Sequence, residues 1–180
     1  MLPDLDAWLP DTVTQECAVE ADNKFPLETG GTFMGWWLNP DTAVITAMIG
    51  PGPGALHERF RFQPDQQWQL EQIAAHYERS GRRETYLGDW HSHPGASSGA
   101  LSWTARGVLR RVIATPEARC ALPLIMILWG SSGTWQLAAW RAQAVPRVVL
   151  WDKLYLNPVQ IIPRVMEFDR RAPTAAFRSM

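Results

Sequence analysis

The chain has 180 residues, 46% of them hydrophobic and 19% charged, with a net charge of −1. This length predicts one compact domain with a sizeable core. The balanced charge gives no electrostatic reason to expect nucleic acid or an anionic membrane as a partner. Cys17 and Cys120 form no Cys-x-x-Cys pair and are expected as buried thiols. Together with the absence of a leader-like or membrane-spanning apolar segment, they favour a cytoplasmic protein.

Apolar periodicity and turn residues predict alternating strands and helices. In chain order we expect an apolar lead-in over 1–10, a helix over 11–23, strands over 28–38 and 42–49, a glycine–proline loop over 50–54, a strand over 57–62, a helix over 64–79, a strand from 84 into the histidine segment, a helix over 103–115, and strands over 122–129, 134–140 and 147–156. This order predicts an α/β fold, with a sheet flanked by helices. The domain is expected over 1–156, followed by a proline- and arginine-containing tail over 157–180.

Two of the four histidines stand one residue apart, as His91 and His93, immediately before Pro94. Because side chains at i and i+2 of a strand leave on the same face, both imidazoles are expected to point in one direction. Pro94 ends the strand because it has no N–H to donate. Converging imidazoles suit a zinc site, although an isolated His-x-His is also typical of two polar residues at an exposed strand end.

Hydrolytic zinc chemistry needs further parts beyond the histidines. A catalytic site usually has three protein ligands and a water, with a general base and an oxyanion donor nearby. Glu28, at the start of a glycine-rich strand, is the candidate base, and its alternative is an exposed loop acid. Ser102, at a helix start, is the candidate oxyanion donor, and its alternative is a plain N-cap.

The segments 28–31, 50–53, 88–94 and Ser102 together resemble the JAMM (MPN-plus, Mov34/PAD-1) metalloprotease family, above all its prokaryotic JAB branch, over about residues 10–150. The resemblance implies a JAB/MPN (cytidine-deaminase-like) fold, in which a mixed β-sheet is flanked by helices. It also implies a Zn²⁺-dependent isopeptidase that removes ubiquitin-like proteins from conjugated targets. The matching positions assign Glu28 as the catalytic base, His91 and His93 as metal ligands, and Ser102 as the oxyanion donor.

The same resemblance implies particular partners and settings. The prokaryotic branch often acts beside ubiquitin-activating and ubiquitin-conjugating-like enzymes, in antiphage CBASS systems or in bacterial ubiquitin-like modification. The substrate would present a small, often glycine-terminated tail, which strand addition could hold through main-chain hydrogen bonds. The stretches 50–56 and 95–100 are candidates for shaping its channel. Trp36, Trp37 and Trp103 could contact a partner, although a place in the core is the favoured interpretation for any one of them.

The third metal-ligand position departs from the family pattern. Three residues after Ser102 the family has Asp, whereas this chain has Ala105, and the loop that leads to Ser102 is one residue longer than usual. Alanine cannot coordinate zinc, so metal affinity should fall strongly. We favour the interpretation that an aspartate was replaced by alanine in an otherwise active protease. A natural pseudoenzyme is the second interpretation. Asp89 as a substitute ligand is the third, although the strand would set it about 6–7 Å back from His91.

Competing functional classes lack their own motifs. A zinc deaminase needs H-x-E with PCxxC, and a classical zincin needs HExxH, and neither motif is present. Neither cysteine lies in the histidine segment, which argues against a cysteine protease. A non-catalytic MPN-like binding module for a ubiquitin-like partner remains the alternative function.

Overall fold

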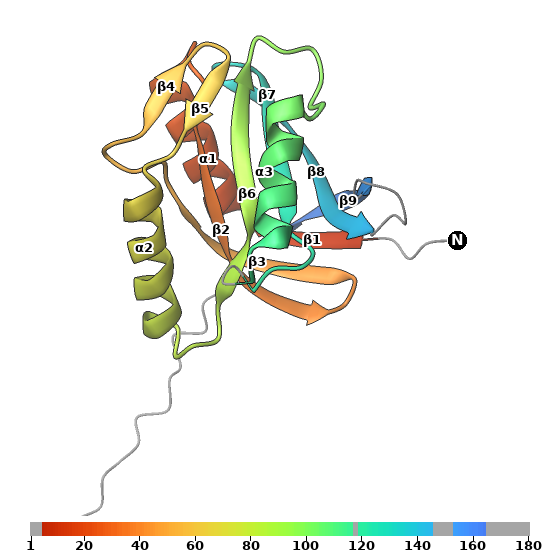
Figure 1. Cartoon of the computed structure of the whole chain (residues 1–180). Coiled ribbons are helices and arrows are strands. Elements are labelled where there is room, and N and C mark those ends of the chain that lie inside the picture. Colours follow the sequence, from red (N-terminus) through yellow and green to blue (C-terminus); the bar gives the residue numbers. More distant parts are fainter. Residues whose placement is uncertain (1–4, 117–118, 146–152, 165–180) are drawn as a thin grey trace, which may run out of the picture.

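The computed structural model describes residues 5–116, 119–145 and 153–164. Its elements run in the order β1 (Leu5–Pro10), α1 (Asp11–Lys24), β2 (Gly30–Asn39), β3 (Thr42–Ile49), β4 (Leu56–Glu58), β5 (Arg61–Gln63), α2 (Gln66–Arg79), β6 (Thr85–Pro94), α3 (Trp103–Ala114), β7 (Leu124–Ser131), β8 (Thr134–Val145) and β9 (Lys153–Arg164). Figure 1 shows these elements around one curved sheet. In this part of the chain, no helix combines the length and the apolar character needed to cross a membrane.

The main sheet is mixed and closes on itself. Its order is β1-β3-β2-β6-β7-β8-β9, and β1 also pairs in parallel with β9. The β6–β7 pair is parallel, whereas the β2–β3, β2–β6, β7–β8 and β8–β9 pairs are antiparallel. The expected α/β mixed sheet is therefore present, but as a barrel-like closure and not as an open sheet. Strands β4 and β5 form a separate hairpin.

Two apolar clusters cover the two faces of β7, because its side chains alternate. Leu124 and Met126 join the cluster that includes the buried side of α1. Ile125 and Ile127 join the cluster beneath α3, together with Leu109 of that helix. Helices α1 and α3 therefore pack on opposite faces of the sheet, as Figure 1 shows.

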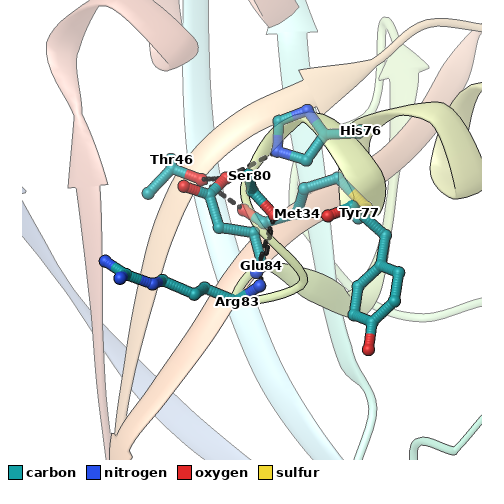
Figure 2. A network of polar contacts seen from close by, with 7 residues as sticks. All are labelled: Met34, Thr46, His76, Tyr77, Ser80, Arg83 and Glu84. Atoms are coloured by element: carbon teal, nitrogen blue, oxygen red, sulfur yellow. Dashed lines mark hydrogen bonds and ion pairs between the residues drawn. The ribbon is translucent and has the colours of Figure 1, made fainter.

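A polar network fastens the carboxyl end of α2 to the sheet (Figure 2). The Glu84 carboxylate accepts hydrogen bonds from Thr46 Oγ1 at 2.6 Å and from His76 Nε2 at 2.5 Å. Ser80 Oγ accepts the backbone N–H groups of Arg83 and Glu84, at 3.3 and 3.1 Å. The network lies just before β6 begins, at the end of the strand opposite the histidines. It fixes the start of the strand that carries them.

Three expected boundaries differ from the structure. The lead-in contains strand β1, which parallel pairing with both β3 and β9 stabilises. The expected strand over 57–62 is instead a hairpin of two short strands. The last strand, β9, runs to Arg164, so residues 157–164, expected in the tail, lie in the sheet although they include Pro158 and Pro163. The rest of the expected tail, residues 165–180, lies outside the described residues, as do 146–152.

Candidate active site

The two histidines share one face of β6, as strand alternation predicts. His91 pairs in parallel register with Ile127 of β7, and His93 pairs with Trp129. Both β7 residues pack in the cluster beneath α3. Since register partners in neighbouring strands point to the same side of a sheet, both imidazoles face the α3 side. The fully buried Ser92 between them faces the α1 side.

The segment that carries Glu28 is bonded to the histidine strand just before β2 begins. The Ser92 N–H donates to the Thr29 carbonyl at 2.8 Å, and Ser92 Oγ accepts the Thr29 N–H at 2.9 Å. Both residues are fully buried. The β2–β6 register, extended by one residue past these bonds, sets Glu28 opposite His93. The candidate base and the two histidines therefore come from adjacent chain segments and share one face.

Gly30 allows the two strands and the β4–β5 hairpin to meet at this point. A Cβ atom at Gly30 would lie 2.3 Å from the Trp90 carbonyl oxygen and 2.9 Å from Phe62 Cε1. The Phe62 ring in turn meets the His91 ring edge-on, with 5.6 Å between the centroids. Any larger residue at position 30 would displace the aromatic ring that covers His91.

The hairpin also holds Glu28 through its backbone. The Glu28 N–H donates to the Glu58 carbonyl at 2.8 Å, and His57 Nδ1 bonds to the Glu28 carbonyl at 3.0 Å. Because a carbonyl can only accept, the His57 proton must sit on Nδ1. Sequence reasoning missed His57 and Phe62 as parts of the site. The available signal was one more histidine beside an alternating aromatic, but nothing local links that segment to Glu28.

Burial sets the protonation of the site residues. Burial raises the pKa of Glu28 to about 7, in the range suited to a general base near neutral pH. Burial, helped by the coulombic effect of the neighbouring His93, lowers the pKa of His91 to about 4. Burial also lowers the pKa of His93. Both imidazoles are therefore neutral at physiological pH, which is the form that binds a metal ion.

Ser102 caps α3, as expected, and keeps a proton to donate. Its Oγ accepts the Ala105 N–H at 3.1 Å, while the side chain is exposed. A hydroxyl that accepts one hydrogen bond can still donate another. The N-cap interpretation is thus confirmed, and the donor role stays a prediction that the cap does not contradict.

Ala105 occupies the position where the family pattern has its third ligand. It is 3% exposed and lies on the same side of α3 as Leu109, which packs on the face that carries the histidines. Position 105 is thus directed toward the sheet, but it offers a methyl group and no donor atom.

The side chains that the structure describes do not complete a zinc site. Across the described ranges, no three His, Cys, Asp or Glu residues are grouped so that they could hold a metal ion. This also argues against Asp89 as a substitute ligand. Burial raises the pKa of Asp89 to about 7, opposed by its hydrogen bond with Tyr86. What remains is a carboxyl base, two neutral imidazoles and a hydroxyl, with a vacant ligand position at Ala105.

Comparisons with known proteins agree with this arrangement. A family model described as prokaryotic homologues of the JAB domain matches residues 10–142. The chain is 44% identical over 147 residues to "Probable metalloprotease y4qB" of Sinorhizobium fredii (strain NBRC 101917 / NGR234), covering 82% of this chain and 90% of that protein. The fold of the present chain is similar to the solution structure of protein DSY2949 from Desulfitobacterium hafniense. The TM-score is 0.62 at 15% identity, and the match covers 90% of this chain and 97% of that one. The shared histidine face and these matches show that the chain belongs to the prokaryotic JAB family.

Proposed function

We propose that this chain is a JAB-type peptidase domain that binds the carboxyl-terminal tail of a ubiquitin-like protein or its conjugated target. We further propose that this chain does not hydrolyse the tail, because Ala105 supplies no third metal ligand. The observation that carries the proposal is the shared face of Glu28, His91 and His93, with α3 directing position 105 toward the same face. A scaffold that only bound a partner would not need a partly buried carboxyl base beside two neutral imidazoles.

The residues present define what the domain would do with a bound tail. In a form whose third metal ligand is restored at position 105, Glu28, with its pKa near 7, would accept a proton from the attacking water and return it to the leaving amine. Ser102 would donate a hydrogen bond to the oxyanion. The backbone of the β4–β5 hairpin is placed beside Glu28, where an extended tail could add as a strand. The expected partners are the ubiquitin-like protein and its activating and conjugating-like enzymes, in a CBASS or related bacterial pathway.

The deciding experiment compares the parent chain with Ala105→Asp. The Asp variant should bind about one zinc, as a three-ligand site does, and should cleave a ubiquitin-like tail fused to a reporter in a chelator-sensitive way. The parent should do neither. Ala114→Asp is the matched control, because Ala114 is exposed at the far end of the same helix. A zinc-loaded Ala105→Asp variant that leaves every such tail uncut would overturn the peptidase proposal.

The alternative function is a non-catalytic binding module with the same fold. The absence of a donor at Ala105 favours it directly. It predicts that Ala105→Asp gains neither zinc nor cleavage, while both forms bind the tail with equal affinity in an anisotropy titration. Equal binding combined with a gain of cleavage would instead identify a disabled enzyme.

A further inference from the structure

The outward side of α3 presents one aromatic, one glycine and three arginines, which we call the α3 outer face: Trp103, Arg106, Gly107, Arg110 and Arg111. Their spacing of three and four residues places them on one side of the helix. The buried residues of α3 lie on its other side. We propose that the α3 outer face docks an acidic segment of a protein partner.

Trp103 is the first observation. Trp36 and Trp37, the other candidate contacts, are partly buried in β2, whereas 86% of Trp103 is exposed. Tryptophan is buried on average because its large ring gains so much from leaving water. Tryptophan is one of the residue types enriched among the side chains that contribute most to binding at protein interfaces.

Gly107 is the second observation, and it is independent of the first. A Cβ atom built there meets nothing within 4 Å, and its φ is not in the left-handed region. Packing within the described chain therefore gives no reason for glycine, although glycine is among the least favourable residues in a helix interior. A partner that lies close against the helix backbone would supply the missing reason.

The positive charge of the α3 outer face indicates an acidic partner. Helix α3 contains arginines at 106, 110 and 111 and no Asp or Glu. Within residues 5–116, 119–145 and 153–164, none of these arginines forms an ion pair or a side-chain hydrogen bond. Free guanidinium groups bind carboxylates through paired hydrogen bonds. The cluster is complementary to a run of Asp or Glu side chains.

An acidic protein segment fits better than a nucleic acid. The whole chain carries a net charge of −1, so it offers little long-range attraction to a polyanion. The mixture of Trp and Arg around a glycine matches the composition of protein interfaces. Since Trp103 directly follows Ser102, a partner held on α3 would lie next to one of the candidate site residues. The docking does not depend on hydrolysis or on the residue at position 105.

The test measures anisotropy of a fluorescein-labelled oligoglutamate peptide with the full chain. Arg110→Glu/Arg111→Glu and Trp103→Ala should each weaken binding by about tenfold or more. Arg79→Glu/Arg83→Glu makes the same charge change at exposed positions near the end of α2 and should have little effect. Gly107→Gln should also weaken binding while the helix becomes more stable, a combination that misfolding cannot produce.

Three results would overturn the proposal. Equal losses in the α3 and α2 charge reversals would show non-specific attraction. Tighter binding of a duplex DNA of equal charge through the same arginines would assign the face to nucleic acid. A change of oligomeric state on Arg110→Glu/Arg111→Glu, seen by light scattering without any effect on the peptide, would assign it to a second copy of this chain.

Discussion

Glu28 should make the unfolding free energy of the domain depend on pH, and the isosteric substitution Glu28→Gln should remove this dependence. Burial raises its pKa from 4.5 to about 7, so the folded chain holds this proton more tightly than the unfolded chain does. The unfolding free energy should therefore fall as pH rises from 4.5 to about 7, because ionising the buried carboxyl is unfavourable only in the folded state. Below pH 4.5 the stabilising contribution of the neutral Glu28 carboxyl is fully present, and above about pH 7 that contribution is lost.

The size of this effect follows from the difference between the pKa of 4.5 and the raised pKa of about 7. At ~1.4 kcal/mol for each pKa unit, the change in unfolding free energy is at most ~3.4 kcal/mol. Because the side chain is only partly buried, we expect on the order of 1–2 kcal/mol. Glu28→Gln keeps the shape and removes the charge. At pH 8 the variant should be more stable than the parent by that amount, and at pH 4 the two should be equal.

Urea denaturation of both proteins between pH 4 and pH 8 measures this difference. Glu58→Gln is the matched control, because Glu58 is an exposed acid on the adjacent hairpin and touches Glu28 only through its backbone. A stability gap between Glu28→Gln and the parent that does not change with pH would refute the reasoning. It would mean that solvent reaches the carboxyl freely and that Glu28 is not tuned as a base.

Three further substitutions test individual contacts of the fold. Glu84→Ala removes the acceptor shared by His76 and Thr46 (Figure 2). It should lower the unfolding free energy measured in urea by ~1–3 kcal/mol. An unchanged midpoint of urea denaturation would mean that these hydrogen bonds are no more stabilising than hydrogen bonds to water. Ser92→Ala removes the side-chain acceptor of the buried Thr29 N–H and should lower the unfolding free energy by ~1–3 kcal/mol. Faster hydrogen exchange of the Thr29 amide is the specific readout. Gly107→Ala fills open space on α3 and should be stabilising by ~0.5–1 kcal/mol; a loss of stability in thermal melts would show that the glycine is needed by the fold.

The parts of the site that local sequence governs were predictable. Strand alternation alone set His91 and His93 on one face, and the position of Ser102 before an apolar helix predicted its cap. The contacts of His57 were not predictable, because they join the hairpin to Glu28 across a loop whose path the local pattern does not specify. The pairing of β1 with β9 joins strands from opposite ends of the chain, and the prolines in β9 argued locally against a strand. Closure of the sheet was therefore beyond sequence reasoning.

The stability of Ala105→Asp should reveal whether position 105 belongs to a metal site, independently of any peptidase assay. Ala105 is 3% exposed, so a carboxylate placed there loses water and, without a partner, should destabilise the fold. Its place in the first turn, three residues after the Ser102 cap, offsets part of that loss through the helix dipole. If His91 and His93 complete a site with it, zinc at 100 times its dissociation constant should restore ~2.7 kcal/mol. The parent, with two ligands, should respond far less, and a chelator should reverse the gain. An Asp variant whose melting temperature ignores zinc would show that α3 does not bring position 105 within reach of the histidines, and the disabled-enzyme interpretation would then give way to the binding module.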